Sequence, residues 1–385
     1  MDNSIVISTP PHVKSKRTTR TVMLDVLIAL APAAICGIVY FLLDAFILEI
    51  TCVAFAVIAE FIYFFIARGG FNVRFANEET KALSKKISAL KKEGKPFQEE
   101  AAALKAKREE LRKAAFAKSR SVFFRFFKQF DFTSVVTGLI LALILPPTAI
   151  WYEAAIGSAF AIIVVKMAFG GTGRNIANPA SVGRVFMFIS FAITTYTAAN
   201  FGPVIEVTGD TLADGATYLS GAMLIEDPNL GALSLLDLFL GTGVAGCIGE
   251  TCKLALIVGF VYLVVRRVIK WWQPVLYLVV LGLMTALLNL DFAFFLPSIL
   301  SGGAMFGAIF MFTDYVTSPK GVYAQIVYYA LAGLLTAVMR HFLQIEVVSF
   351  VIILMNLIVP LLDRYIRRRP FGFRREKKQK EVADK

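Results

Sequence analysis

The stretch VMLDVLIALAPAAICGIVYFLL at residues 22–43, followed after three residues by ILEITCVAFAVIAEFIYFFI at residues 47–66, decides the class of fold. Both runs consist almost entirely of apolar side chains. A helix that crosses a bilayer needs about 20 such residues in succession. We therefore expect two transmembrane helices at the start of the chain.

The rest of the chain has the same character. Of its 385 residues, 57% are hydrophobic and 18% are charged, and the mean hydropathy is +0.68. A soluble domain of this size could not bury so much apolar surface. We expect an all-α polytopic membrane protein with about ten transmembrane helices. The apolar runs lie at residues 22–43, 47–66, 132–145, 154–169, 182–199, 254–268, 275–290, 292–312, 322–339 and 347–362.

One further apolar stretch, LLDLFLGTGVAGCI at residues 235–248, is rich in glycine. A full span here would move Arg266, Arg267 and Lys270 to the opposite side of the membrane. We expect a re-entrant or broken segment, which a membrane protein tolerates where it is buried in protein or lines a cavity.

Lysine and arginine account for a net charge of +12, but they are confined to particular segments. They precede the first span, fill the loop at 69–130 and dominate the tail at 364–385, whereas the loop at 200–233 is acidic. Because basic residues collect on the cytoplasmic side, both termini and the basic loop are expected in the cytoplasm. Membrane orientation explains the charge, and nucleic-acid binding is not expected.

The chain thus divides into seven parts. These are a cytoplasmic N-terminus (1–21), two helices (22–68), a charged cytoplasmic loop (69–130), helices three to five (131–199), an external loop (200–233), the re-entrant segment with helices six to ten (234–363) and a basic cytoplasmic tail (364–385).

The charged loop mixes Glu, Lys, Ala and Leu, which favour helix, and is interrupted once at Gly94–Lys95–Pro96. This composition predicts a cytoplasmic helical hairpin, either a solvated insertion or a docking surface for a soluble partner. The four cysteines are scattered and the histidines number two, so we expect buried thiols and no metal site.

Three places could carry chemistry. The external string Asp214–Gly215–Ala216–Thr217 exposes a hydroxyl on an unobstructed turn, as covalent attachment to Thr217 would require.

The glycine-rich turn FGGTGRNIANPASVGR at 169–184 can present the amides of Asn175 and Asn178 to a ligand, or can simply end a helix. Acidic residues within or beside the spans predict an ion path, for which Asp25 and Glu250 are the candidates. The others are Glu60, Asp237 and Asp314.

A weak internal similarity relates residues 139–163 to residues 283–310, with Gly157 opposite Gly303 and Phe160 opposite Phe306. Membrane domains built from two halves often place a ligand or a pathway where the halves meet. A chance match between two apolar stretches is the alternative.

Several strings resemble the D subunits of the Rnf complex, the ion-pumping ferredoxin:NAD oxidoreductase of bacteria and archaea. They are PHVKSKRTTRTVMLDVLIALAPA, DFTSVVTGLILALILPP, FGGTGRNIANPASVGR, SLLDLFLGTGVAGCIGET, SGGAMFGAIFMFTDYVTSP and LMNLIVPLLDRYIRRRPFG. The related B subunit of the sodium-pumping NADH:quinone oxidoreductase is similar too. The DRYIRRRPFG ending favours the Rnf member.

This resemblance implies ten helices in two inverted halves, like urea transporters, in the plasma membrane of a bacterium or archaeon. It implies FMN joined by a phosphoester to a Ser/Thr-Gly-Ala-Thr motif, here at Thr217, although Asp214 replaces the first residue and Tyr218–Leu219 the usual Pro-Leu. It further implies a non-covalent riboflavin at the glycine-rich turn, with Asn175 and Asn178 as contacts.

The function expected from these observations is electron transfer between ferredoxin and NAD, coupled to Na⁺ or H⁺ translocation. The chain would work with the A, B, C, E and G subunits of an Rnf complex, and ferredoxin and NAD would bind to those partners. The alternatives are the B subunit of the quinone-reducing relative and a urea- or ammonium-type solute channel without redox function.

Overall fold

The computed structural model describes residues 17–67, 123–128, 130–147, 149–191, 235–241, 246–343 and 346–366, with single positions 102, 105, 106 and 109. All regular structure in these ranges is helical, and they contain no strand. The N-terminus at 1–16, nearly all of the predicted hairpin, the external loop at 200–233 and the tail at 367–385 lie outside the described residues.

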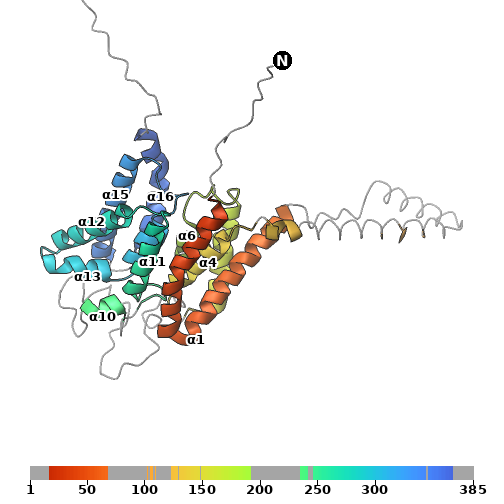
Figure 1. The fold of residues 1–385 in the computed structure, drawn as a ribbon, viewed down its shortest axis with the longest axis horizontal. Coiled ribbons are helices and arrows are strands. Elements are labelled where there is room, and N and C mark those ends of the chain that lie inside the picture. The colour runs from red at the N-terminus through yellow and green to blue at the C-terminus, as the bar shows by residue number, and fades with distance from the viewer. Residues whose placement is uncertain are drawn as a thin grey trace, which may run out of the picture.

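The described helices follow one another along the chain (Figure 1). Their bounds are α1 Thr19–Ala67, α4 Thr133–Leu143, α5 Trp151–Phe160, η1 Ala161–Met167, α6 Pro179–Ser190, α10 Leu235–Leu240, α11 Lys253–Val265, α12 Trp272–Leu288, η3 Phe292–Phe294, α13 Phe295–Leu300, α14 Ala304–Phe306, η4 Gly307–Met311, α15 Val322–Leu343 and α16 Val348–Tyr365.

Helix α1 contains both of the first two apolar runs. Its 49 residues would extend about 74 Å as one straight helix, more than twice the roughly 30 Å thickness of a bilayer core. The backbone leaves the helical region at Leu42, where φ is 52° and ψ is −130°. The two limbs diverge from this break as a V in Figure 1, the first in red and the second in orange. Each limb therefore has the length of a single membrane span.

The helices are apolar on their outer faces as well as their inner ones. On α12, Val275, Val279, Leu283 and Leu287 recur every four residues and are all exposed, while Tyr277 and Leu281 on the other side are fully buried. Such a helix is compatible with a bilayer around the protein but not with water. The fold is accordingly that of a polytopic membrane protein.

By length and composition, three of the described helices could cross a membrane: α1, α15 and α16. The shorter helices α4, α11 and α12 are also apolar. The number of ten transmembrane helices and their inverted arrangement remain predictions.

The apolar run at 292–312 is expected to form one span, but the structure divides it. Helices η3 and α13 are separated from α14 and η4 by a break at residues 301–303, and the two parts are bent by 68°. The sequence SerGlyGly at the break accounts for the difference, because Gly302 adopts a φ of 55° that side chains disfavour. Hydropathy averages over such a break and cannot detect it.

The two aligned phenylalanines occupy equivalent places. Phe160 ends α5 and Phe306 ends α14, and a π-helix, η1 or η4, begins at the next residue in each case. The turns that follow η1 and η4 line one shared cavity. The ends of the two aligned segments therefore lie at the same cavity.

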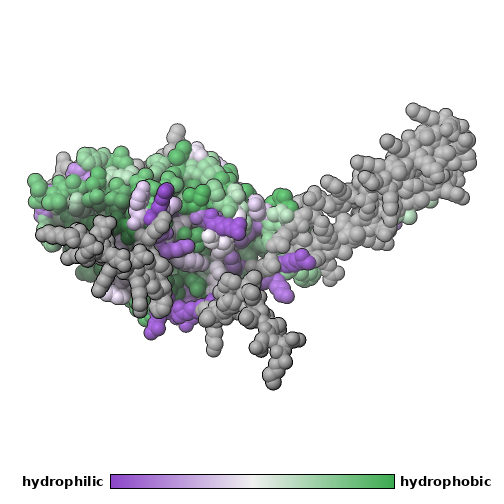
Figure 2. All heavy atoms as spheres, turned by 90° about the horizontal axis from the view of Figure 1, so that it is seen from above, coloured by the Kyte–Doolittle hydropathy of each residue, from purple (hydrophilic) through white to green (hydrophobic). Residues whose placement is uncertain are grey.

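One end of the molecule carries the beginning of α1 and the end of α16, and we call it the terminal end. At this end, Arg17 donates to the carbonyl of Arg267 at 3.4 Å, which joins the start of α1 to the turn after α11. Lys320 N–H donates to Asp363 at 3.1 Å, which joins the turn before α15 to the end of α16. The terminal end is the upper end in Figure 1. Figure 2 views it from above and shows polar side chains gathered over its middle, with apolar side chains along the flank.

The glycine-rich stretch at 235–248 is not a continuous helix in its described residues. Helix α10 is six residues long, and residues 246–252 are non-helical and largely buried. There the N–H groups of Ile248 and Gly249 donate to the carbonyls of Leu145 and Leu143, at 3.1 and 2.7 Å. The irregular backbone is thus hydrogen-bonded inside the protein, as the prediction of a broken segment requires.

Candidate functional site

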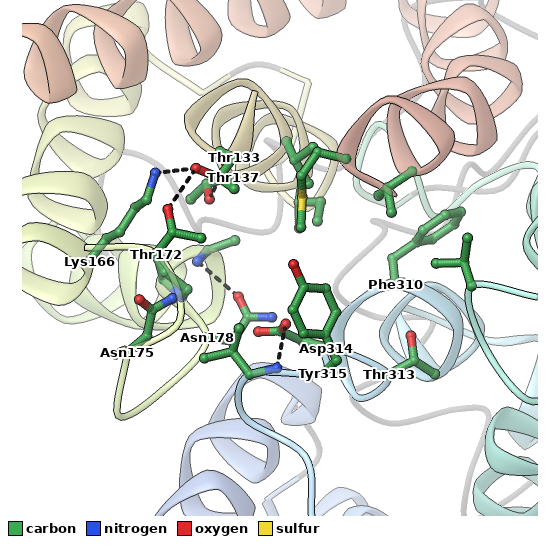
Figure 3. A pocket seen from close by; sticks show the side chains of 18 of the residues that line it. Thr133, Thr137, Lys166, Thr172, Asn175, Asn178, Phe310, Thr313, Asp314 and Tyr315 are labelled. Carbon is green, nitrogen blue, oxygen red and sulfur yellow. Dashed lines mark hydrogen bonds between the residues drawn. The ribbon is translucent and has the colours of Figure 1, made fainter. Parts of the chain in front are cut away.

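A cavity opens near the terminal end, between the first and second halves of the chain (Figure 3). The empty space between its walls is about 840 Å³, a figure that includes open solvent at the mouth. Its walls are largely apolar and polar groups lie at its edge, a combination suited to a flat ring with a hydrogen-bonding rim. The apolar lining includes Met23, Val136, Ile140, Leu263, Ile309 and Phe310, and the polar lining includes Thr133, Thr137, Lys166, Thr172, Asn175, Asn178, Thr313, Asp314 and Tyr315.

The glycine-rich turn forms one edge of this cavity. Gly170, Gly171 and Gly173 adopt φ values of 105°, 87° and 88°, which residues with a side chain rarely accept. These conformations reverse the chain between η1 and α6 and place Asn175 and Asn178 at the cavity. The structure therefore brings both predicted amides together.

The two asparagines have different roles in the fold. Asn178 caps α6, accepting hydrogen bonds from the N–H groups of Ala180 and Ser181 at 3.0 and 3.4 Å, and its amide group donates to the carbonyl of Met311 at 3.4 Å. The side-chain oxygen of Asn175 is buried and has no hydrogen-bond partner among the described residues. Since a buried acceptor normally has one, Asn175 is the better candidate for contact with a ligand.

The same edge carries a hydrogen-bonded network around Lys166, which belongs to η1 and is joined to the glycine-rich turn through Thr172 (Figure 3). Its ammonium group donates to Glu60 at 2.8 Å and to the hydroxyl of Thr133 at 2.5 Å. Thr133 in turn donates to Asp131 at 2.6 Å, and Thr172 donates to the second oxygen of the same carboxylate at 3.0 Å. The network ties α1, η1 and α4 together.

The turn between η4 and α15 closes the cavity with Asp314 and Tyr315. Burial raises the pKa of Asp314, although hydrogen bonds from Val316 N–H and the Thr317 hydroxyl oppose the shift. Burial, with the nearby carboxylates of Asp314 and Asp131, raises the pKa of Tyr315 to about 12. The phenol therefore stays protonated at neutral pH and can donate a hydrogen bond.

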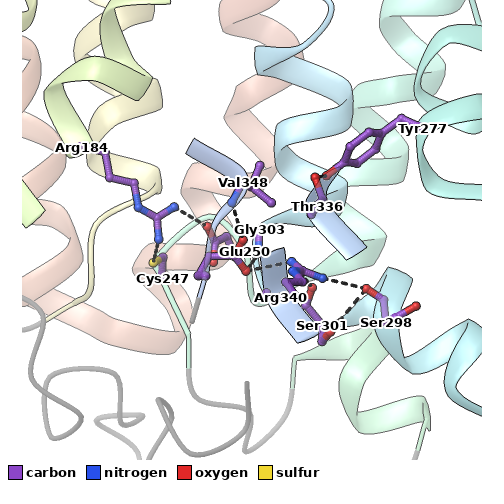
Figure 4. Close-up of polar contacts among 12 residues, drawn as sticks. Arg184, Cys247, Glu250, Tyr277, Ser298, Ser301, Gly303, Thr336, Arg340 and Val348 are labelled. Carbon is purple, nitrogen blue, oxygen red and sulfur yellow. Dashed lines mark hydrogen bonds and ion pairs between the residues drawn. The ribbon is translucent and has the colours of Figure 1, made fainter. Parts of the chain in front are cut away.

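A second polar centre lies deeper in the protein and contains the predicted ion-path residue Glu250 (Figure 4). Arg184 donates to Glu250 at 3.2 Å and to the sulfur of Cys247 at 3.6 Å. Lys253 donates to the carbonyls of Glu250 and Gly302. Arg184, Glu250 and Lys253 are all nearly inaccessible to solvent. We call this group, together with Arg340 and Glu346, the central charged cluster.

The break between α13 and α14 explains why charges gather in this cluster. Arg340 donates to the carbonyls of Ser298 and Ser301, at 3.0 and 3.4 Å, where α13 ends. Glu346 accepts from Gly303 N–H at 3.1 Å, where α14 begins, and pairs with Arg340 at 2.8 Å. Cations thus meet free carbonyls and an anion meets a free N–H, as the polarity of helix ends requires.

Asp25, the other predicted ion-path residue, lies apart from Glu250 in the contact network. It accepts hydrogen bonds from Tyr262 and Arg266, both at 3.1 Å, near the terminal end. The described contacts give Asp25 and Glu250 no common partner. Whether either residue carries an ion stays a prediction.

Thr217, the predicted site of covalent FMN, lies outside the described residues. Lys166, Arg184, Arg340 and Glu346 were not predicted from the sequence as functional residues. The signal was present for Lys166, a lysine inside the apolar run at 154–169, because an ionisable residue within a span is costly and needs a partner.

Comparison with known proteins agrees with this architecture. The sequence profile described as the NQR2, RnfD, RnfE family matches residues 6–83 and 113–372. The chain is 32% identical to the D subunit of the Na⁺-translocating ferredoxin:NAD⁺ oxidoreductase complex of Acetobacterium woodii, over 98% of both chains. It is 30% identical to the D subunit of the proton-translocating ferredoxin:NAD⁺ oxidoreductase complex of Clostridium ljungdahlii, over 97% of this chain and 98% of that one.

A third relative is the D subunit of the ion-translocating oxidoreductase complex of Alcanivorax borkumensis, with 36% identity over 67% of this chain and 80% of that one. These relatives carry the same subunit designation although their names differ in the ion that is moved. The profile match and the full-length similarity together show that the chain belongs to the NQR2, RnfD, RnfE family.

Proposed function

We propose that this protein is the flavin-carrying membrane subunit of an Rnf-type complex. It passes electrons between partner subunits during the exchange between ferredoxin and NAD, while the complex translocates Na⁺ or H⁺. The support is the similarity over almost the whole chain to D subunits whose names state this activity. The chain is one subunit of a translocase and needs the A, B, C, E and G subunits for turnover.

The observation that carries a flavin role is the cavity between the two halves. A flavin ring is flat and largely apolar, and its rim offers N–H and carbonyl groups, so it matches apolar walls with the buried Asn175 oxygen at their edge. Asn175 and Asn178 would hold a non-covalent riboflavin there. The ring supplies the redox chemistry when bound, and the protein supplies position and electrostatics.

Covalent FMN on Thr217 would be a second electron carrier, in addition to the non-covalent riboflavin. Basic residues before α1 and after α16 favour a cytoplasmic terminal end, and the acidic loop at 200–233 favours an external position for Thr217. The two flavins would then lie near opposite faces of the plasma membrane. Electrons could cross the bilayer between them.

The translocated ion is not assigned by similarity. The relatives from Acetobacterium woodii and Clostridium ljungdahlii are almost equally similar to this chain, and one is named for Na⁺ and the other for protons. Asp25 and Glu250 are proposed for the ion path on either alternative.

The test uses the full-length chain produced in a host that expresses a flavin transferase. After denaturing electrophoresis, the native band should fluoresce and the Thr217→Ala band should not, whereas Thr211→Ala in the same loop should leave the fluorescence intact. Riboflavin extracted from the native chain without protease, and lost in Asn175→Ala, would support the second site. A dark native band without extractable flavin, together with solute flux in liposomes, would instead support the channel alternative.

A further inference from the structure

Lys166 is a buried cation at the wall of the proposed flavin cavity. Only 2% of the residue is exposed, yet it is one of the residues that line the cavity. An ammonium group has three donors, and among the described residues the contacts to Glu60 and Thr133 use two of them. The third has no partner among the described residues.

The carboxylate of Glu60 balances the positive charge of Lys166 and, among the residues that the structure describes, is not itself part of the cavity lining. It lies on the second limb of α1 and is 7% exposed, and among the described residues the cavity lining includes Lys166 but not Glu60. One Glu60 oxygen accepts from Lys166, and the other is buried and has no partner in the described part of the chain. The positive end of this ion pair is therefore the end nearer the cavity.

A buried ion pair is a costly way to join helices. Replacing one by apolar residues of similar size is often neutral or stabilising, so such a pair is weak support for a purely structural role. Ionisable residues inside a membrane are by default candidates for function. Lys166 also belongs to a π-helix, a conformation that occurs often at functional sites.

We propose that Lys166 sets the reduction potential of the flavin in this cavity by stabilising the negative charge that the ring gains with an electron, and that Glu60 offsets part of this effect. The inference rests on the proposed function. One electron comes from the reduced flavin or iron–sulfur carrier that precedes this site in the complex, and that carrier is oxidised by one electron. No bond to the protein forms or breaks. Lys166 and Glu60 are thus positioning residues that act on the ring through their charges.

The two members of the pair can be changed separately. Lys166→Met removes the cation that faces the cavity. The potential should then fall, because the ring loses the favourable positive field. Glu60→Gln leaves the cation without its counter-charge, so the potential should rise. The double variant removes both charges, so its potential should also lie below that of the native chain, whose positive charge is the one nearer the cavity.

The experiment uses the full-length chain with Thr217→Ala, which carries no covalent FMN, purified with its non-covalent flavin. The midpoint potential is measured by optical redox titration, and flavin affinity is measured separately by titration calorimetry with riboflavin. We expect shifts of at least tenfold in the one-electron equilibrium constant, which correspond to about 59 mV. Lys128→Met, which removes an exposed lysine outside the cavity, is the control and should leave the potential unchanged.

Opposite shifts for Lys166→Met and Glu60→Gln would support the proposal, because general loss of packing would not produce opposite signs. If flavin stays bound and the potentials do not move, or move in the same direction, Lys166 has no such role. If Lys166→Met fails to fold, the uncharged double variant provides the same comparison with Glu60→Gln. A native chain that retains no flavin at all would instead refute the cavity assignment in the proposed function.

Discussion

Arg184 and Glu250 are separated by 66 positions in the chain and form a buried ion pair, with 3.2 Å between the guanidinium and the carboxylate. The pair joins α6 in the first half to the irregular segment that precedes α11 in the second half. This ion pair therefore links the first and second halves of the chain at a point where the helical structure is interrupted.

Removal of one partner should destabilise the protein more than removal of both. Arg184→Met leaves Glu250 buried without its guanidinium, and breaking a buried pair in this way typically costs about 3–5 kcal/mol. The double variant Arg184→Met with Glu250→Gln should recover part of that loss. Thermal unfolding of the purified chain in detergent measures both. A double variant less stable than Arg184→Met would contradict an energetic coupling between the two residues.

Gly303 allows Glu250 to approach the helix break. A Cβ atom at this position would collide with the Glu250 carboxylate, which Arg184 holds in place. We expect Gly303→Ala to lower the free energy of unfolding by about 1–3 kcal/mol, as overpacking of a well-packed interior does. Gly246→Ala is the matched control, because the nearest atom to its added Cβ is 3.9 Å away. Equal losses for the two variants would exclude a specific clash at Gly303.

The capping role of Asn178 can be separated from a role in flavin binding. Asn178→Ala removes the cap of α6 and should cost about 1 kcal/mol, within the usual range of 0.5–2 kcal/mol. Asn178→Ser keeps a capping oxygen but loses the amide donor, so it should be the more stable of the two. Both should bind riboflavin less tightly than the native chain. Native affinity in the serine variant would limit Asn178 to the cap.

Asp25 should matter more for ion movement than for stability. Its partner Arg266 has a side chain that is 51% exposed, and ion pairs with solvent access contribute only about 0–1 kcal/mol. In the assembled complex, Asp25→Asn should lower Na⁺ or H⁺ uptake by proteoliposomes several-fold and leave the melting temperature and flavin content nearly unchanged. Arg266→Met, which keeps the carboxylate, is the comparison. Unchanged ion uptake in Asp25→Asn would remove this residue from the proposed path.

The sequence predicted the helical class, because bilayer spans need long apolar runs that are visible in any window. The sequence also indicated a ligand-binding role for the glycine-rich turn, in which Gly170, Gly171 and Gly173 adopt the positive φ angles that favour glycine. It did not predict the break at 301–303, the π-helices after Phe160 and Phe306, or the central charged cluster. Those features depend on contacts between distant segments, such as Arg340 with Ser298, and on single-residue changes in helical register.

The order of the two buried ion pairs along the chain has a consequence for biogenesis. When the ribosome adds Lys166, its partner Glu60 has already been made, so this charge can enter the bilayer with its counter-ion at hand. For Arg184 the order is reversed, because the carboxylate of Glu250 follows 66 residues later and those residues take roughly 3–13 s at the usual rates of synthesis. The Arg184–Glu250 contact therefore cannot form until this part of the second half has been synthesised, several seconds after Arg184 itself.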